Sequence, residues 1–472
     1  MKTIDKIYVN GAFVTPNGTE VFDLINPSNN ETIGKVTLGD ETDTQNAIAA
    51  AKAAFVHFSQ TTKEERIACL QKMYEAVAKR EKELVEVMIQ EYGGTRAFSA
   101  MAAHYTLDNI LKTIETLSAF EFEKTVGSSP IVLSPLGVVG IITPWNSSNS
   151  FITSKLSMAI AAGSTAVIKP SEMSALQTQV LLEALHEAGL PAGVFNVVNG
   201  RGDVVGTEIT RHPDIAKISF TGSTAVGKSI ARGAVDTMKR VTLELGGKSP
   251  NIILDDANFE TAIPLALTAA YMNSGQACVA GTRLLVPENR LEEAERLLVK
   301  AIDNITVGNP ADAATAVGPM VSKKQYERVQ GYIKLGQEEG AKLLAGGEGK
   351  PEGLEAGNFV KPTIFTNVNN TMRIAREEIF GPVLSVLTYQ NEEEAIAIAN
   401  DTTYGLSAYI SSSNPERARR VANRIEAGRV LINGLSHDPL APFGGFKQSG
   451  MGREFGVYGL EEYVEPKALL IS

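Results

Sequence analysis

Several features that mark other protein classes are scarce in this chain. Two cysteines, Cys69 and Cys278, are too few for a disulfide framework in 472 residues, and they favour a reducing compartment. No apolar run reaches the roughly 18–20 residues that cross a bilayer, and the first six residues contain no apolar signal-peptide core. We therefore expect a cytoplasmic protein that does not act at a membrane.

Positive charge is also scarce, since 44 Lys and Arg stand against 54 Asp and Glu, for a net charge of −10. This balance argues against a nucleic-acid partner. The five histidines show no spacing typical of a metal site, so no metal is expected. Neither the G-x-G-x-x-G dinucleotide fingerprint nor the G-x-S-x-G nucleophile elbow occurs.

The remaining sequence alternates strand-like and helix-like stretches. Residues 6–33 predict hairpin strands, and 44–58 and 63–92 predict helices, the first capped at Asp43 or Thr44. From residue 131 onward short apolar runs alternate with helical stretches such as 155–162, which predicts βαβ units and a parallel sheet. We expect an α/β fold with at least two closely packed cores.

Three segments could carry chemistry. Cys278 lies among small residues that would let a substrate approach its sulfur, although a buried inert cysteine is the alternative. Glu244 ends an apolar strand, where desolvation would raise its pKa toward that of a general base; a solvated strand end is the alternative. Asn146 follows a strand and the only Trp, where its amide could donate to an oxyanion; a packing turn is the alternative.

A fourth segment, Gly222-Ser223-Thr224-Ala225-Val226-Gly227-Lys228-Ser229, matches the P-loop pattern after a predicted strand. Downstream, the apolar run that ends in Asp255-Asp256 could supply a magnesium ligand. A P-loop nucleotide hydrolase is therefore a rival hypothesis. Under either interpretation, a helix that starts near Gly222 can hold a phosphate at its N-terminus.

Taken in order, seven short segments resemble those of the aldehyde dehydrogenase superfamily, over nearly the whole chain. The colinear set is far more specific than the P-loop pattern and outweighs it. The segments are Pro144-Trp145-Asn146, Lys169-Pro170-Ser171-Glu172, Phe220-Thr221-Gly222-Ser223-Thr224 with Gly227, Glu244-Leu245-Gly246-Gly247-Lys248, Gly275-Gln276-Ala277-Cys278, Glu378-Ile379-Phe380-Gly381-Pro382 and Pro442-Phe443-Gly444-Gly445-Phe446-Lys447.

The resemblance implies an enzyme that oxidises an aldehyde to the carboxylic acid with NAD(P)+. Cys278 would attack the carbonyl, and the amide of Asn146 with the backbone N–H of Cys278 would hold the oxyanion. Hydride transfer to the nicotinamide would leave a thioester, which Glu244 would help water to hydrolyse. This glutamate separates the chain from the CoA-acylating branch. The non-enzymatic alternative, a cofactor-binding structural protein of the same fold, is disfavoured because all three residues are present.

The resemblance also implies NAD as the preferred cofactor, with NADP as the alternative. Lys169 and Glu172 would hold the adenosine ribose, where a carboxylate disfavours a 2′-phosphate. Ser223 would contact the pyrophosphate and Glu378 the nicotinamide ribose. The other expected cofactor contacts are Ile142, Thr143, Pro144, Trp145, Ser171, Gly202, Phe220, Gly222, Gly227, Leu245, Gln325 and Phe380.

By the same resemblance, a Rossmann-like cofactor domain would comprise 1–116 and 135–246, and an α/β catalytic domain 247–459. A small β element for oligomerisation would comprise 117–134 and 460–472. The apolar tail 468–471 has no obvious partner in its own core, which favours pairing with a second subunit in a homodimer or homotetramer. Docking onto its own chain is the alternative.

The chain departs from the superfamily after Asn146, where relatives often carry bulky apolar residues. Ser147-Ser148-Asn149-Ser150 and Ser154 predict a wider, more polar substrate tunnel and hence a bulky or polar aldehyde. No Arg or Lys is evident in these stretches to anchor a carboxylate, which disfavours a semialdehyde acid. The expected substrate contacts are Ser147, Ser150, Ser154, Val279, His437 and Phe443.

Overall fold

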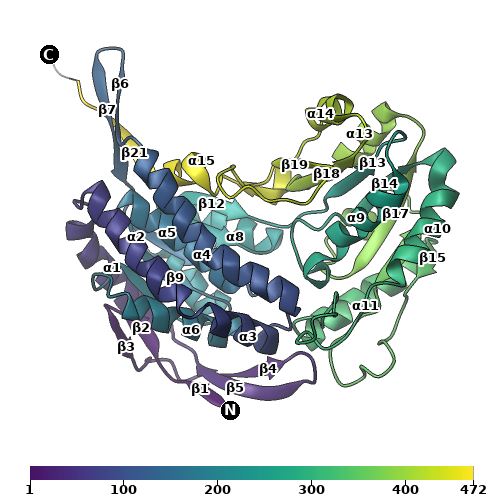
Figure 1. Ribbon diagram of the computed structural model, residues 1–472. Coiled ribbons are helices and arrows are strands. Elements are labelled where there is room, and N and C mark those ends of the chain that lie inside the picture. The colour runs from purple at the N-terminus through teal and green to yellow at the C-terminus, as the bar shows by residue number, and fades with distance from the viewer. Residues whose placement is uncertain (471–472) are drawn as a thin grey trace.

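The computed structural model describes residues 1–470 as two α/β halves built on separate sheets (Figure 1). The eight-stranded sheet of the N-terminal half lies on the left of the view and the seven-stranded sheet of the C-terminal half on the right. The predicted α/β class is confirmed. Across the first sheet the strands are β20 (Gly450–Met451), β12 (Arg240–Glu244), β11 (Ile215–Thr221), β8 (Val138–Ile142), β9 (Thr165–Lys169), β10 (Phe195–Val197), β2 (Ile7–Val9) and β3 (Ala12–Val14).

Five central strands of this sheet run parallel, from β10 through β9, β8 and β11 to β12. Numbered along the chain, their order is third, second, first, fourth, fifth, as in one half of a doubly wound sheet. The strand order reverses between β8 and β11, so the crevice beyond their carboxyl ends is the expected ligand site. Both Val138–Ile142 and Thr165–Lys169 are buried throughout, as continuous apolar strands covered on two faces should be.

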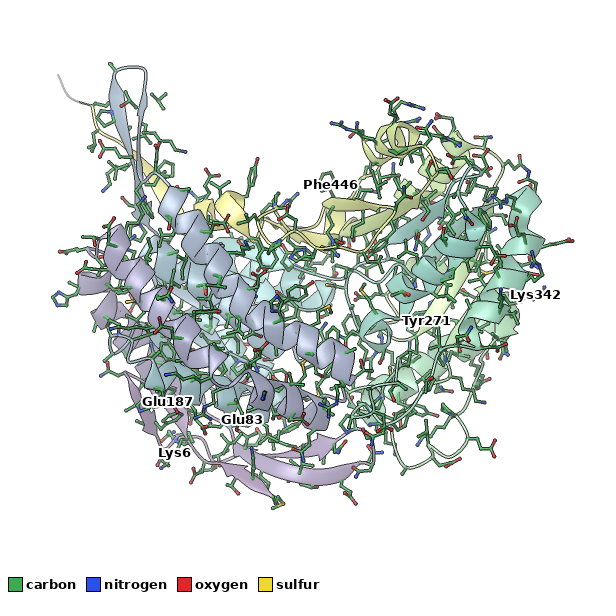
Figure 2. All side chains as sticks on the ribbon, viewed as in Figure 1. Lys6, Glu83, Glu187, Tyr271, Lys342 and Phe446 are labelled. Carbon is green, nitrogen blue, oxygen red and sulfur yellow. The ribbon has the colours of Figure 1, made fainter. Side chains whose placement is uncertain are left out.

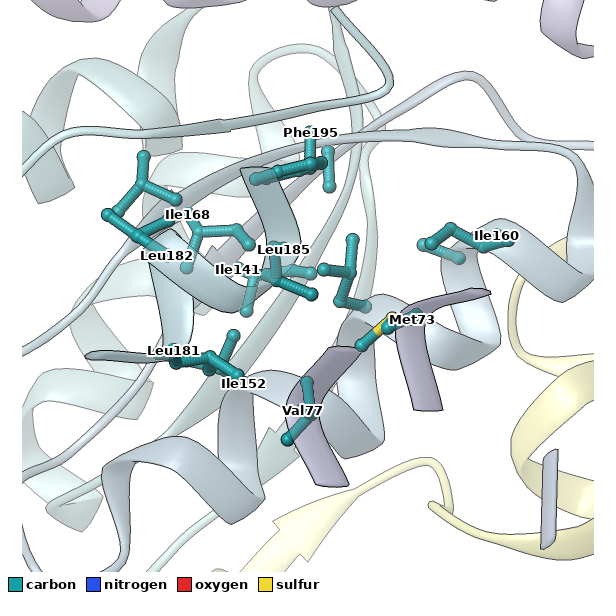
Figure 3. Packing of buried hydrophobic residues seen from close by; sticks show 14 of the residues in the cluster. Met73, Val77, Ile141, Ile152, Ile160, Ile168, Leu181, Leu182, Leu185 and Phe195 are labelled. Atoms are coloured by element: carbon teal, nitrogen blue, oxygen red, sulfur yellow. The ribbon is translucent and has the colours of Figure 1, made fainter. Parts of the chain in front are cut away.

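Helices cover both faces of the first sheet. Alternate side chains of β8 enter different cores: Val139 and Ile141 pack with one set of helices, Val138 and Ile142 with the other. Figure 3 shows part of the larger core, where Met73, Ile152 and Leu181 from three helices meet Ile141. That core contains α2 (Lys63–Ala78), α3 (Glu81–Glu91), α4 (Arg96–Ala119), α5 (Ser148–Ala162) and α6 (Ala175–Glu187), and the other contains α1 (Glu41–Phe58), α7 (Thr207–Arg211) and α8 (Thr224–Val235).

The second sheet is parallel except for its edge strand β15. Its strands in order are β15 (Lys342–Ala345), β16 (Thr363–Thr366), β17 (Val383–Tyr389), β14 (Arg283–Pro287), β13 (Pro250–Ile253), β18 (Ser407–Ser411) and β19 (Arg429–Ile432). One face packs against α9 (Phe259–Tyr271) and α10 (Leu291–Ile302), and the other against α11 (Lys323–Glu338), α12 (Arg373–Arg376), α13 (Glu392–Asn400) and α14 (Pro415–Ala422). The segment after β19 returns to the first half and carries Phe446 (Figure 2) and α15 (Gly456–Glu461).

Two small sheets complete the fold. One contains β1 (Lys2–Ile4), β5 (Glu31–Thr37) and β4 (Val21–Asn26). The other stands away from the body at the upper left of Figure 1 and contains β21 (Val464–Ala468), β7 (Ser129–Pro135) and β6 (Glu123–Val126). Within the segments expected to mediate oligomerisation, 117–119 end α4 and 460–461 end α15; residues 471–472 lie outside the described part.

Some predicted element boundaries were wrong. Helix α1 begins at Glu41 with Asp40 as its cap, because Asp40 and Asp43 form a reciprocal capping box. The stretch 63–92 divides into α2 and α3 at Lys79–Arg80. The helix expected from 155 begins at Ser148, so the serine-rich stretch is its first turn. In residues 1–470, no helix has the length and hydropathy needed to cross a membrane, and no group of three or more His, Cys, Asp or Glu could hold a metal ion.

Candidate active site

The candidate site lies where the two sheets meet. Glu244 is the last residue of β12, and only five residues connect it to β13 in the second sheet. The carboxyl ends of the first sheet therefore face the amino ends of the second. Asn146 follows β8, and Cys278 and Glu378 precede β14 and β17. The fold thus brings together four of the predicted site residues that are up to 232 positions apart, from 146 to 378.

The cysteine loop begins with an unusual backbone turn. Asn273, Ser274 and Gly275 all have left-handed backbones, with φ values of 50°, 57° and 72°. A left-handed conformation costs a non-glycine residue roughly 1–2 kcal/mol. At Gly275 a Cβ atom would lie 2.3 Å from the backbone of Gly381, so a side chain is excluded there. The turn reverses the chain after α9 and presents Cys278 toward the first sheet.

A buried hydrogen-bond network holds this turn. The hydroxyl of Tyr92, which follows α3, donates to Asn273 Oδ1 at 2.7 Å and accepts from Gln276 Nε2 at 3.2 Å. Gln276 Oε1 accepts from the backbone N–H of Val321 at 3.0 Å, and Ser274 Oγ accepts from that of Gly318 at 2.8 Å. Two distant parts of the chain, Tyr92 and the segment 318–321, therefore fix the loop. The sequence did not single out Tyr92, Asn273, Ser274, Gly318 or Val321. Of this network, only Gln276 lay within a segment that was identified from the sequence.

Asn146 is tied to the same loop. Its Nδ2 atom donates to the backbone oxygen of Gln276 at 3.0 Å, two residues before Cys278, and the side chain is 7% exposed. A side-chain amide has two N–H donors, so this bond orients the group and leaves a second donor free. The arrangement matches what an oxyanion donor beside a nucleophile requires.

The thiol of Cys278 is unpaired and partly accessible. Its backbone oxygen lies so near Gly247 that a Cβ there would approach within 2.2 Å. Burial, followed by the negative charges of Glu378 and Glu244, raises the pKa of the Cys278 thiol to about 12, while Arg429 acts in the opposite direction. Both carboxylates thus lie close enough to act on the sulfur electrostatically.

Glu244 is 2% exposed, and neither of its carboxylate oxygens has a hydrogen-bond partner within residues 1–470. Burial, reinforced by the charge of Glu454, raises its pKa well above the ordinary value. Oε1 lies 2.9 Å from where a Cβ on Gly444 would stand, so the absence of a side chain there leaves the carboxyl group room. A buried carboxyl without a structural hydrogen bond is suited to proton transfer.

Charged groups that the sequence did not single out lie behind Glu244. Lys155 of α5 forms a buried ion pair with Glu454, and both affect the pKa of Glu244. Lys217 of β11 is fully buried beside Thr242, and burial lowers its pKa to about 8. A buried pair needs both charges, because removal of one leaves the other uncompensated. No local motif marks these residues; only the α5 packing and the return of the C-terminal segment bring them together.

The expected adenosine contacts gather beyond β9. Lys169 Nζ lies 3.6 Å from Glu172 Oε2, and Arg201 lies 3.5 Å from Glu172 Oε1. Ser171 Oγ accepts from the backbone N–H of Met173 at 3.3 Å, and the space that a Cβ on Gly202 would face is open. The Glu172 carboxylate is therefore oriented by two cations and remains partly exposed.

The expected pyrophosphate contacts surround the start of α8. Ser223 caps this helix, with Oγ accepting from the backbone N–H of Val226 at 3.4 Å. Gly222 leaves room for the ring of Phe220, and Gly227 for the side chain of Leu245. The start of α8 thus packs against Phe220 of β11 and against Leu245, which directly follows β12. The Thr143 hydroxyl is buried and has no hydrogen-bond partner within residues 1–470.

This geometry does not support a P-loop. Helix α8 starts at Thr224, so the pattern forms helix instead of a phosphate-wrapping loop. Lys228 donates to Gln448 Oε1 at 2.8 Å. Asp255, the proposed magnesium ligand, follows a strand of the other sheet and pairs with Arg417 at 2.7 Å. The predicted P-loop hydrolase is therefore not supported.

The expected nicotinamide contacts also cluster. Glu378 Oε1 accepts from the backbone N–H of Gly247 at 3.0 Å, and burial raises the pKa of Glu378 to about 7. Trp145 packs edge-on against Phe380 at 5.5 Å, and Gln325 Nε2 donates to the backbone oxygen of Phe380 at 2.8 Å. These side chains connect the first sheet to the second beside the thiol.

Some of the expected substrate residues are hydrogen-bonded within the fold, and others are partly exposed. Ser154 is 5% exposed and donates to Phe151 within α5, and Ser150 Oγ accepts from Asn109. Ser147 is partly exposed, and so is Phe151, a bulky residue one turn further along. On the opposite side, the Tyr409 hydroxyl donates to the backbone oxygen of Val279. His437 and Phe443 both contact Phe455, with ring centres 5.5 and 5.9 Å away.

Comparisons with known proteins agree with this geometry. The sequence profile of the aldehyde dehydrogenase family matches residues 13–469. A 3-succinoylsemialdehyde-pyridine dehydrogenase from a Pseudomonas species is 44% identical over 472 residues, covering 100% of this chain and 99% of that protein. A mutant of aldehyde dehydrogenase C from Pseudomonas syringae, crystallised with NAD+ and octanal, shares 44% identity and a TM-score of 0.97, covering 98% of this chain and 96% of that chain. Betaine aldehyde dehydrogenase from Staphylococcus aureus, in complex with NAD+, shares 36% identity and a TM-score of 0.96, covering 98% and 94%.

Proposed function

This chain belongs to the aldehyde dehydrogenase family, and from that premise we propose that Cys278, Glu244 and Asn146 oxidise an aldehyde to its carboxylic acid with NAD+. As a family member the chain is an oxidoreductase, and neither a P-loop hydrolase nor a structural protein is supported. The observation that carries the proposed roles is the unpartnered Glu244 carboxyl, whose charge acts on a thiol loop that also anchors Asn146.

In the proposed reaction the Cys278 sulfur adds to the aldehyde carbon while its proton passes to Glu244. The free N–H of Asn146 and the backbone N–H of Cys278 hold the resulting oxyanion. When bound, NAD+ accepts a hydride from that carbon, which leaves a thioester on Cys278. Glu244 first gives up the thiol proton to solvent. Water then adds to the thioester while Glu244 takes a proton from it, and this proton passes to the sulfur as the acid is released.

We propose that the buried Lys155–Glu454 pair carries protons away from Glu244. Its charges act on Glu244, and Glu454 comes from the segment that also passes Gly444 beside Glu244. A base that must accept a proton twice per turnover needs a route by which to lose it, and an adjacent ionisable pair supplies one.

NAD+ fits the residues at the end of the first sheet. The unpartnered Thr143 hydroxyl, the open space at Gly202 and the first turn of α8 offer a donor, room and an anion site, respectively. Glu172 would accept the adenosine ribose hydroxyls, and its charge disfavours a 2′-phosphate, so NAD is the preferred cofactor and NADP the poorer one. We assign cofactor binding to 1–116 and 135–246, and catalysis to 247–459.

The substrate we propose is a bulky or polar aldehyde, because small Ser147 stands directly before α5, at a position where a large side chain would narrow the site.

The projecting strands β6, β7 and β21 would join subunits in a homodimer or homotetramer. A cytoplasmic location remains a prediction, supported by the two free cysteines.

A substrate screen that measures NADH absorbance tests the central proposal. We expect turnover with wild-type protein, and Cys278→Ala should reduce it by at least about a thousandfold. Because Trp145 is the only tryptophan and lies at the proposed cofactor site, quenching of its fluorescence by NAD+ reports binding. Quenching should persist in Cys278→Ala, which separates a lost nucleophile from a lost fold. Undiminished turnover in this variant would overturn the proposal.

A further inference from the structure

Arg429 is a partly buried arginine that contacts a serine, a histidine and a phenylalanine and, among the described residues, pairs with no carboxylate. Its Nε donates to Ser407 Oγ at 3.0 Å, and its NH1 lies 3.4 Å from His437 Nδ1. The guanidinium carbon is 5.3 Å from the ring centre of Phe443. Within residues 1–470 no acidic side chain forms an ion pair with it, whereas Arg80 pairs with three glutamates. A half-buried guanidinium of this kind retains donors for an anion.

The position of Arg429 relates it to the thiol. It begins β19 and lies in register with Ser407 of β18. Two residues further along β18, Tyr409 donates to the backbone oxygen of Val279, next to Cys278. The positive charge of Arg429 also counteracts the elevation of the Cys278 pKa. The guanidinium therefore lies on the side of the second sheet that carries the nucleophile, within electrostatic reach of the sulfur.

Further aromatic side chains pack around His437 and Phe443, the two rings that Arg429 contacts. Tyr105 of α4 packs edge-on against His437 at 5.8 Å, and His437 and Phe443 both pack against Phe455. Burial, with a further contribution from Arg429, lowers the pKa of His437. The imidazole is therefore neutral at neutral pH, and with Nδ1 toward Arg429 its other nitrogen can donate a hydrogen bond. One cation, one neutral donor and several aromatic faces are thus grouped together, and the cation lies within electrostatic reach of the sulfur.

We propose that Arg429 anchors a carboxylate at the far end of the aldehyde substrate, so that the preferred substrates are flat aldehydes that also carry a carboxylate group. This inference rests on the proposed function and specifies its substrate class. It replaces the sequence-based expectation that no cation was available for such a group. That expectation considered the segments beside Asn146 and Phe443, whereas the guanidinium comes from the start of β19. Bidentate geometry makes arginine suited to this task.

Paired aldehydes test the proposal. The acids 4-carboxybenzaldehyde and 3-carboxybenzaldehyde are each compared with the corresponding uncharged formylbenzamide, by kcat/KM from NADH formation. We expect wild-type protein to favour at least one acid over its amide by tenfold or more, through a lower KM. Arg429→Met should reduce this ratio at least tenfold. Arg429→Lys keeps the positive charge but loses the planar guanidinium that can donate two parallel hydrogen bonds, so it should give an intermediate ratio.

The control is Arg420→Met, which removes the same charge from an exposed position on α14 and should leave the ratio unchanged. Quenching of Trp145 by NAD+ shows that each variant is folded. A wild-type ratio near one for both pairs, or a ratio that Arg429→Met does not change, would overturn the assignment of Arg429. If the Arg429 assignment fails but the amides still give NADH, the proposed function stands. If no aldehyde gives NADH, the proposed function itself is rejected.

Discussion

Cys278 carries its proton at neutral pH, because burial and the charges of Glu378 and Glu244 raise the pKa of its thiol to about 12. A thiol whose pKa lies well above the ambient pH is mostly protonated, and the thiolate is its reactive form. A neutral thiol beside a protonatable carboxyl can add to a carbonyl with its proton passing directly to Glu244. The resting sulfur is therefore protected from stray electrophiles.

This state predicts slow alkylation of the resting enzyme. In Cys69→Ser protein, which leaves Cys278 as the only thiol, the rate of iodoacetamide labelling should rise about tenfold per pH unit from 7 to 9. Mass spectrometry of the labelled protein measures the rate, with free cysteine as the reference. A plateau below pH 9 would show that the resting pKa of Cys278 is much lower than about 12.

Glu244 predicts a different kinetic signature. Glu244→Gln keeps the shape of the side chain but cannot take a proton from water, so the thioester should accumulate. We expect a burst of about one NADH per active site, slower than the first wild-type turnover because the thiol has also lost its proton acceptor, followed by turnover at least about a hundredfold slower than wild type. Stopped-flow absorbance resolves both phases. Glu461→Gln, at an exposed position seven residues after Glu454, is the control. Linear turnover at the wild-type rate would show that another group activates water.

The turn Met272–Gly275 shows what the sequence could and could not predict at the scale of elements. Continuous apolar runs correctly predicted the parallel strands β8 and β9, because burial on both faces leaves a pattern within a few residues. The left-handed turn before Cys278 leaves no such pattern, since its partners come from Tyr92, Gly318 and Val321. Arg429 escaped prediction for the same reason: the pairing of β18 with β19 determines where it lies.

Tyr92 therefore predicts an effect at a distance. Tyr92→Phe removes the hydroxyl that satisfies Asn273 Oδ1 and Gln276 Nε2, and leaving such groups buried and unpaired costs about 1–3 kcal/mol. The loop should loosen, so kcat should fall roughly tenfold while the KM for NAD+ changes little. Tyr458→Phe, at an exposed position, is the matched control. An unchanged kcat in Tyr92→Phe would show that the loop holds its shape without this hydrogen bond.

For the whole molecule, the sequence resemblance correctly predicted family and fold class, because its seven segments occur in the same order over nearly the whole chain. That resemblance is confirmed by the family match over residues 13–469. Assembly follows less directly from the sequence. The apolar tail indicated an exposed strand, but β21 pairs with β7 of its own chain through Ala468. What remains exposed is the end of the tail and the edges of the projecting sheet.

These exposed features predict the oligomerisation surface. Val126 of β6 is 65% exposed, and Leu469 and Leu470, which directly follow β21, are 40% and 85% exposed. Both strands belong to the sheet that stands away from the body. An open strand edge with apolar neighbours favours association with another chain.

Wild-type protein should therefore behave as a dimer or tetramer in light scattering at micromolar concentration. The double variant Leu469→Asp and Leu470→Asp should shift toward smaller species, because it places charges in the contact, while NAD+ still quenches Trp145. Val56→Asp, at an apolar residue of α1 that is 56% exposed, should leave the mass unchanged. If the tail variant keeps the wild-type mass, subunits associate through another face.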